Sequence, residues 1–243
     1  RQVRSSALGK LIIMLAVVAA IVFGVAIFFK VNTIEVQGNT VYSAEQIVEA
    51  SQIRQGDNLL TVNKALAVGN IKAALPYVED VSIARSLPDG IIIQVHESTI
   101  CFAVMTDTNA AWLIGPGGKA LERIEPAAFN EYPHIDGLLI ASPTAGQSVS
   151  SSSPTALSAV LSVMSELDGT GLLEHIRAIN VEKEYDIIVW YDDRYEIKLG
   201  GTDEMAYKIR YLCAILDQLS EYQAGTIDLS QAAEKKATFQ PST

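Results

Sequence analysis

A continuous apolar segment near the start of the chain limits what it can fold into. The run LIIMLAVVAAIVFGVAIFF, residues 11–29, has no charged and no polar side chain. As a helix rising about 1.5 Å per residue, it would be roughly 28 Å long, close to the thickness of a bilayer's hydrocarbon core. A secretory signal has a shorter apolar region, about 7–15 residues, and ends in small residues at its cleavage site. This run ends in AIFFK, so we expect a retained transmembrane helix rather than a cleaved signal or a buried core helix.

The charges that flank this segment predict its orientation. Arg1, Arg4 and Lys10 precede it, and residues 1–10 contain no acidic side chain. Positively charged flanks are retained in the cytoplasm. We therefore expect a single-pass type II membrane protein with a cytoplasmic tail over residues 1–10, a transmembrane helix over residues 11–29, and all later residues outside the membrane.

The part of the chain outside the membrane is strongly acidic. The whole chain carries 18 Lys and Arg against 28 Asp and Glu, a net charge of −10. Three of the basic residues lie in the tail, so the remainder carries 15 basic residues against all 28 acids, a charge of about −13. Nucleic-acid binding needs clustered Lys and Arg. The composition therefore predicts no nucleic-acid partner.

Few residues could form a disulfide or hold a metal ion. Cys101 in TICFAVM and Cys213 in IRYLCAIL have apolar neighbours, which is typical of small buried side chains. A disulfide between them is the open alternative, because disulfides are permitted outside the membrane. His96, His134 and His175 are scattered singly, without the spacing of metal ligands. No metal site is predicted.

Residues 31–97 alternate between strand-like and helix-like segments. VNTIEVQGN reads as a short strand stopped by a turn. A helix follows Ser43, which has capping-box spacing to Gln46, and a second helix follows Asn63 and ends before Pro76. VEDVSIARS and IIIQVHE then predict two strands joined by the turn LPDG. The predicted order is β-α-α-β-β.

This order resembles the POTRA domain, a three-stranded sheet with two helices on one face. More specifically, the basic N-terminus and the single apolar segment, followed at once by this domain, resemble the FtsQ/DivIB family of bacterial cell-division proteins. The pattern V-x-x-I-x-V-x-G-N that supports this resemblance is present as Val31, Ile34, Val36, Gly38 and Asn39. GDNLLTVN and LPYVEDVSIARSLPDGIIIQVHE continue it. The resemblance implies a POTRA domain over residues 30–98.

The rest of the chain predicts a second domain. NAAWLIGPGGKALERI and IIVWYDDRYEIKL are typical of hairpins, and residues 142–155 of an exposed loop. A helix begins at Ser153-Pro154, and another begins at Thr202. The second carries an apolar stripe made of Met205, Ile209, Leu212, Leu216 and Leu219. GTIDLS predicts a late strand, and ATFQ is a candidate for one more.

The motifs YEIKLGG, MAYKIRYLCAIL and GTIDLS are similar to the β domain of the FtsQ/DivIB family. We expect that domain over residues 99–230 and a C-terminal tail over residues 231–243. The predicted fold class is α+β: an N-terminal transmembrane helix, a POTRA domain (β-α-α-β-β), and then a mixed α/β domain with antiparallel hairpins.

The sequence does not assemble an active site. It lacks G-x-S-x-G, the paired S-x-x-K and K-T-G motifs, and H-E-x-x-H. GPGGK lacks the P-loop spacing and is interpreted as a β-turn. Asp192 and Asp193 lie at a hairpin tip, where solvated turn formers are expected rather than catalytic carboxylates. We therefore predict no enzyme activity, no cofactor and no small-molecule substrate.

The resemblance implies a scaffold at the division septum that binds FtsB/DivIC-like and FtsL-like partners outside the membrane. A sheet whose last strand is unprotected can accept a partner segment as a further strand. By resemblance, the partner docks at the C-terminal edge of the β domain, at Ile227, Asp228, Leu229, Gln231, Thr238 and Phe239. The edge of the POTRA sheet at residues 31–37 is a second candidate.

Two other functions remain open from the sequence. A POTRA-type protein transport or insertion component is one, although such proteins usually carry repeated POTRA units or a membrane barrel, and neither pattern is present in this sequence. A membrane-anchored cell-wall enzyme is the other, and it would need a convergent polar site.

Overall fold

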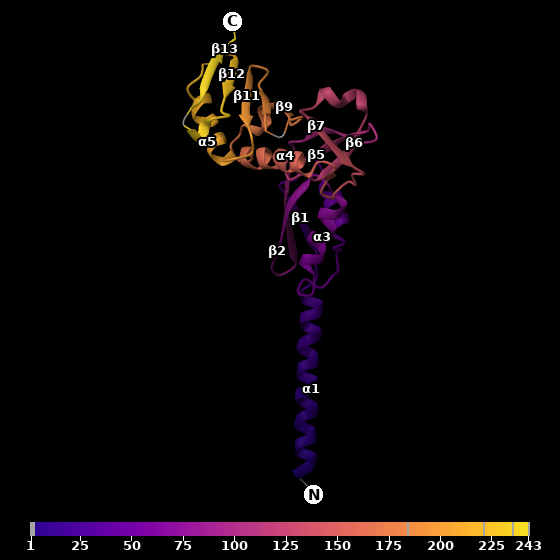
Figure 1. The fold of residues 1–243 in the computed structure, drawn as a ribbon. Helices are drawn as coiled ribbons and strands as arrows, with labels where there is room; N and C mark the ends of the chain where they lie inside the picture. The colour runs from indigo at the N-terminus through magenta and orange to yellow at the C-terminus, as the bar shows by residue number, and fades with distance from the viewer. Residues whose placement is uncertain (1–2, 184, 221, 235, 243) are drawn as a thin grey trace. The chain divides into compact units, whose positions relative to one another are not determined.

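The computed structural model describes residues 3–183, 185–220, 222–234 and 236–242, without the side chains of residues 3–8, 22, 25–27 and 233. The chain divides into two compact units, Arg1–Glu97 and Ser98–Thr243 (Figure 1). Each unit has its own sheet and its own hydrophobic core.

Helix α1 (Val3–Phe28) contains nearly all of the apolar segment. Its side chains are described without interruption only from residue 9 to residue 21. Over the residues that the structure describes, no helix reaches the length and hydropathy needed to cross a membrane. The predicted transmembrane segment, residues 11–29, thus lies partly outside the described side chains, and the membrane span stays a prediction.

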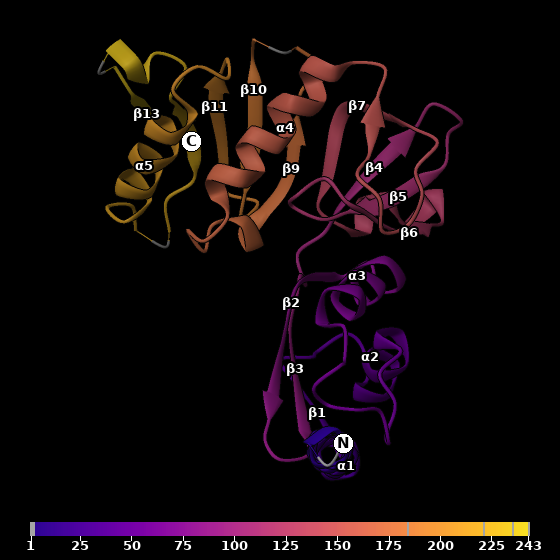
Figure 2. The same ribbon diagram turned by 90° about the horizontal axis from the view of Figure 1, so that it is seen from below.

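The first unit contains the predicted order of strands and helices. Its elements after α1 are β1 (Thr33–Gln37), α2 (Ala44–Ser51), α3 (Lys64–Ala74), β2 (Val78–Ser86) and β3 (Gly90–Glu97). Strand β3 lies in the middle of a three-stranded sheet, parallel to β1 and antiparallel to β2. Figure 2 shows α2 and α3 on the same face of this sheet. The β-α-α-β-β order of a POTRA domain is confirmed.

Both helices of this unit begin where their caps predict. The Ser43 hydroxyl accepts the N–H of Gln46, and the Gln46 side chain accepts the N–H of Ser43, which completes the capping box. The Asn63 side chain accepts the N–H of Leu66 at 3.1 Å and caps α3. Helix α3 ends at Ala74, because a residue before a proline is disfavoured in the helical conformation.

The loop from β1 into α2 is held by one buried carboxylate at the end of β3. Glu97, 7% exposed, accepts the backbone N–H groups of Thr40 at 2.6 Å, Val41 at 2.5 Å and Tyr42 at 3.3 Å. It also accepts the Thr40 hydroxyl at 3.0 Å. A buried charge is tolerated when hydrogen bonds satisfy it. These four bonds therefore connect the last strand of the unit to its first loop.

The second unit is built on a ten-stranded sheet. Its order is β13-β12-β11-β10-β9-β7-β4-β5-β6, with the short β8 paired to β7. The strands are β4 (Phe102–Thr106), β5 (Ala111–Ile114), β6 (Ala120–Ile124), β7 (His134–Ala141), β8 (Ser150–Ser151), β9 (Ile176–Asn180), β10 (Ile187–Tyr191), β11 (Tyr195–Gly200), β12 (Gly225–Asp228) and β13 (Thr238–Pro241). The helices are α4 (Pro154–Leu167) and α5 (Met205–Leu216), with short 3-10 turns at Pro126–Glu131, Leu173–His175 and Ala232–Glu234.

The two helices of this unit cover one face of the sheet (Figure 2). A row of register neighbours crosses the sheet on that face, and its members are all buried in the core: Ile179, Val189, Ile197 and Ile227. Strand residues alternate between faces, so the next row lies on the opposite side. We call that side the open face; its row is Ala178, Trp190, Glu196, Thr226 and Gln240.

The predicted hairpins β5–β6 and β10–β11 are confirmed as antiparallel pairs. Three further pairs, β4 with β7, β7 with β9, and β11 with β12, are parallel. Both cysteines are free thiols. Burial, and to a lesser extent the charge of Glu122, raises the pKa of the Cys101 thiol.

Helix α5 begins three residues later than the prediction from Thr202. Glu204 has a φ of +50°, in the left-handed region, so a regular helix cannot include it. Lys208, fully buried, donates from Nζ to the Gly201 carbonyl at 2.8 Å and lies 3.4 Å from the Asp203 carboxylate. These contacts hold the loop ahead of the helix.

Candidate partner-docking surface

The six residues predicted to bind a partner lie together on and beside the last two strands of the sheet. Strand β12 pairs with β11 on one side and with β13 on the other. In this register Ile227 lies opposite Phe239, and Asp228 lies opposite Thr238. Leu229 and Gln231 follow β12 in the connection to β13. The six residues share one region but differ in exposure.

Three of the six contribute to the core of the unit. Ile227 and Leu229 are both 0% exposed, in the cluster covered by α4 and α5. Phe239 is half-buried and packs against that cluster, with its ring centroid 6.3 Å from that of Tyr195. Ile227 and Leu229 therefore offer no side chain to solvent.

The other three are polar and accessible. Thr238 and Gln231 are exposed, and Asp228 is half-buried. The Asp228 carboxylate accepts the N–H of Ser230 at 2.9 Å and the Ser230 hydroxyl at 2.7 Å, which closes the turn after β12. Asp228 thus has a structural role in addition to its accessibility.

At this end of the sheet, the edge strand among the described residues is β13 and not β12. Residues 231–243, expected as a tail, include this strand, which occupies the outer edge of β12. The N–H of Ser242 donates to the Ala224 carbonyl at 2.8 Å. Hydrogen-bonded and non-hydrogen-bonded pairs alternate along an antiparallel ladder. The N–H and C=O of Phe239 therefore point away from β12, to the side where the sheet order ends.

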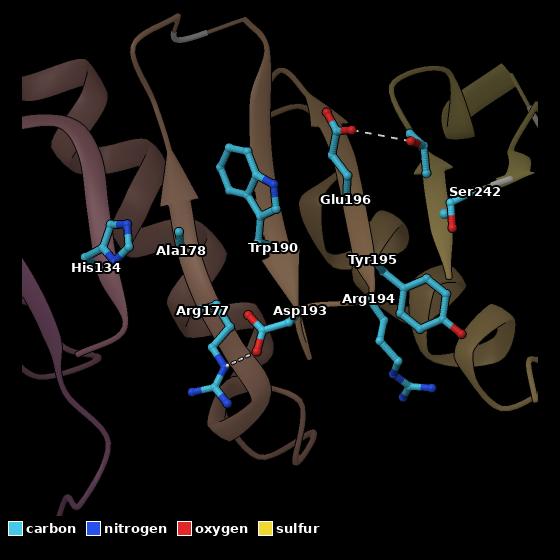
Figure 3. A pocket seen from close by; sticks show the side chains of 11 residues that line it. His134, Arg177, Ala178, Trp190, Asp193, Arg194, Tyr195, Glu196 and Ser242 are labelled. Carbon is cyan, nitrogen blue, oxygen red and sulfur yellow. Dashed lines mark hydrogen bonds and ion pairs between the residues drawn. The ribbon is translucent and has the colours of Figure 1, made fainter. Parts of the chain in front are cut away.

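The open face of the same strands carries a shallow hollow of about 510 Å³ (Figure 3). The indole of Trp190 lies at its centre, with Ala178 opposite on β9 and Glu196 opposite on β11. Arg177 lies 3.4 Å from the Asp193 carboxylate, and the Thr226 hydroxyl donates to Glu196 at 3.3 Å. Both interactions are drawn in Figure 3.

The sequence analysis did not identify this hollow. The alternation in IIVWY, which places Ile188 and Trp190 on the same face away from the core, is the signal that could have found it. Its charged groups are mixed, and several are engaged in ion pairs. The hydroxyl of Thr226, hydrogen-bonded to the Glu196 carboxylate, also lies in this lining.

The side chains that could bind a metal ion are not grouped in the described part of the chain. Over the part of the chain that the structure describes, no three His, Cys, Asp or Glu side chains come together as they would around a metal ion. His134 instead contacts the Tyr132 carbonyl and the ring of Phe129.

Two acidic residues lie at the tip of the β10–β11 hairpin; one accepts hydrogen bonds from neighbouring side chains and the other is largely exposed. Residues 192–194 connect the two strands, and Asp192 and Asp193 both have positive φ, at 53° and 54°, as the central residues of a type I′ turn do. Asp193 is largely exposed, as expected for a turn former. Asp192 accepts from Nδ1 of His175 at 2.9 Å and from the Arg194 guanidinium at 3.3 Å. The hairpin tip is therefore connected to the residues before β9.

These contacts predict an acid-dependent contribution to stability. Burial raises the pKa of Asp192, but the hydrogen bonds and charges of His175 and Arg194 outweigh it, and the net pKa is lowered. A lowered folded-state pKa stabilises the unit above the ordinary Asp pKa of about 3.9, and this stability is lost as the pH falls through the folded-state value. Asp192→Asn should cost roughly 0.5–1 kcal/mol at pH 7 and nothing in strong acid. Urea titrations at both pH values test this; an equal cost at both would contradict it.

Comparison with known proteins agrees with this architecture. The family model for the FtsQ-type POTRA domain matches residues 29–98, and that for the C-terminal part of cell division protein FtsQ/DivIB matches residues 103–230, more than half of the chain. A cell division protein DivIB of Clostridium botulinum (strain Hall) is 26% identical over 206 residues, covering 84% of this chain and 79% of that protein. A cell division protein FtsQ of Corynebacterium glutamicum is 24% identical over 205 residues, covering 84% and 85%. The chain belongs to the FtsQ/DivIB family of cell-division proteins.

Proposed function

We propose that this protein is a non-enzymatic, membrane-anchored scaffold of the bacterial division machinery that binds FtsB/DivIC-like and FtsL-like proteins outside the membrane during septum formation. The observation that carries this proposal is the free edge of β13 in a unit that matches the FtsQ/DivIB C-terminal model. An unpaired strand edge offers N–H and C=O groups that a partner segment can pair with.

The docking surface has two parts in this account. The backbone of Phe239 on β13 supplies the ladder that a partner strand joins. The exposed side chains of Gln231 and Thr238, beside the Asp228 carboxylate, supply specificity. Ile227 and Leu229 act indirectly, because they position β12 from within the core. The free edge of β1 in the first unit's sheet is a second docking edge.

The membrane anchor of this scaffold is the apolar segment at residues 11–29, with the N-terminus in the cytoplasm and both folded units outside. The purity of that segment and its cationic flank support this orientation. An anchored domain has little freedom to leave the membrane surface, so it meets other single-span proteins at high effective concentration.

Co-purification from membranes tests this function. The full chain, extracted in mild detergent, should retain FtsB/DivIC-like and FtsL-like proteins in a fixed ratio, and the outside units should be digested by protease added to intact spheroplasts. Recovery of translocation substrates instead would favour the transport function. A protease-resistant second unit in intact spheroplasts would contradict the orientation.

A further inference from the structure

Backbone hydrogen bonds define two ends of the POTRA domain. At one end, the N–H of Val31 donates to Asp57, the N–H of Leu59 donates to Phe29, and the N–H of Asn32 donates to Asp89, each at 2.8 Å. This gathers the residues just after the apolar segment, the loop 52–63 and the turn 86–90. We call it the Lys30 end. Glu97 and the loop 38–43 that it holds form the opposite end, the Glu97 end.

Exposed apolar side chains concentrate at the Lys30 end. Residues 30–97, all of them described, have four large apolar side chains that are exposed: Val41 at 47%, Leu60 at 44%, Leu66 at 60% and Leu87 at 66%. Leu60 lies in the loop 52–63, Leu87 lies in the turn 86–90, and Leu66 lies in the first turn of α3 directly after that loop. Only Val41 belongs to the Glu97 end. Exposed apolar groups gathered on one side of a domain mark an interaction site.

One arginine ties these loops into a single surface. The Arg85 guanidinium donates to the carbonyls of Leu59 at 2.7 Å, Leu60 at 3.0 Å and Val62 at 3.3 Å. Arg85 is two residues before Leu87, and Val62 is next to the cap of α3. The loop that carries Leu60 is therefore held against the end of β2, two residues before Leu87.

The positive charges of this domain, like its exposed apolar side chains, are concentrated at the Lys30 end. Residues 30–97 contain five Lys and Arg and eight Asp and Glu. Four of the five cations, Lys30, Arg54, Lys64 and Arg85, lie at the Lys30 end, with only two of the eight acids, Asp57 and Asp89. The domain is acidic as a whole, but this end is cationic.

We propose that the Lys30 end is a lipid-contact surface, which places Leu60, Leu66 and Leu87 among the headgroups of the bilayer and the surrounding cations beside lipid phosphates. This inference rests on the proposed anchor, because residue 30 follows directly after the apolar segment. Apolar side chains of interfacial segments reach about 5–10 Å into the boundary between headgroups and acyl chains. Basic residues at the surface are attracted by anionic lipid. The bilayer is therefore the occupant that matches both the leucines and the charges.

The contact gives the scaffold a defined orientation. A domain connected to a membrane helix by a single chain crossing could rotate about that connection. Two loops and the first turn of a helix, all in contact with the interface, remove this freedom. The Glu97 end of the domain is then directed away from the lipid.

Site-specific fluorescence of the full chain tests this proposal. An environment-sensitive NBD label is attached to one cysteine at a time, Leu87→Cys, Leu60→Cys, Val41→Cys or Ile21→Cys, with Cys101 and Cys213 replaced by alanine. The protein is reconstituted in phosphatidylcholine–phosphatidylglycerol vesicles containing nitroxide-labelled lipid. Labels at Leu87 and Leu60 should lose several-fold more fluorescence to headgroup nitroxides than the label at Val41. The label at Ile21 should be quenched by mid-chain nitroxides.

The pattern of quenching across the four labelled positions distinguishes failure of the lipid contact from failure of the membrane anchor. Quenching at Ile21 without quenching at Leu87 and Leu60 overturns the lipid contact and leaves the anchor intact. Absence of quenching at Ile21 overturns the anchor and the lipid contact with it. Equal quenching at Leu87 and Val41 contradicts a contact specific to the Lys30 end. A label at Leu87 that responds only when a purified FtsL-like partner is added assigns the surface to a protein instead of lipid.

Discussion

Replacing Ile227 with alanine is expected to lower the free energy of unfolding of the second unit by about 2–5 kcal/mol. Ile227 is fully buried between its register neighbours Ile197 and Phe239, so truncation leaves a cavity in the core beneath α4 and α5. Both tryptophans, Trp112 and Trp190, lie in this unit. Urea unfolding of the full chain followed by tryptophan fluorescence therefore reports this unit alone.

Thr238→Ala is the matched control for that substitution. Thr238 lies on the neighbouring strand, one position from Phe239 in sequence, but it is exposed, so its truncation should change stability by less than about 0.5 kcal/mol. Comparing Ile227→Ala with Thr238→Ala distinguishes an effect on stability from an effect on partner binding within the six residues predicted to bind a partner. An Ile227→Ala protein that keeps full stability but loses its partner would show that Ile227 faces the partner, against its burial here.

Glu97→Gln is expected to destabilise the POTRA domain by about 1–3 kcal/mol. An amide cannot supply the charge or both acceptor oxygens, so the N–H groups of Thr40 through Tyr42 lose part of their hydrogen bonding. The first effect should be local, with faster hydrogen exchange at Val41 and Tyr42, measured by mass spectrometry on the full chain.

Glu49→Gln makes the same chemical change at an exposed position on α2. It should leave the exchange of the 40–42 loop unchanged. If both variants speed hydrogen exchange in the 40–42 loop equally, the loss of a negative charge explains the effect, and the hydrogen bonds of the Glu97 carboxylate do not hold this loop.

Local signals made much of the fold predictable. The capping box at Ser43 and Gln46, the cap at Asn63 and the alternation of the strands each depend on residues close in sequence. These features were sufficient to derive the β-α-α-β-β order and both hairpins. The start of α5 was misplaced, because the left-handed conformation of Glu204 leaves no trace in residue type.

The candidate site was less predictable for a physical reason. Whether Ile227 faces a core or a partner depends on which strand lies outside β12, and strand order is set by contacts between distant segments. A four-residue strand near the end of a polar stretch carries a weak signal, so the sequence offers ATFQ only as a candidate strand, and its position outside β12 comes from the structure. The open face around Trp190 was missed for a similar reason, since its residues come from separate strands.

The central claim, that a partner adds a strand to β13, is tested most directly by removing one N–H group. Phe239→Pro deletes the N–H that points away from β12, and proline is tolerated on an edge strand where its nitrogen faces solvent. Phe239→Leu keeps this N–H and most of the apolar contact, so it is the matched control. Binding of the full chain to the outside segment of a DivIC-like partner should weaken at least about tenfold for Phe239→Pro relative to Phe239→Leu, which corresponds to roughly 1.4 kcal/mol. Equal affinity of the two folded variants would contradict docking at this edge and direct the search to the free edge of β1.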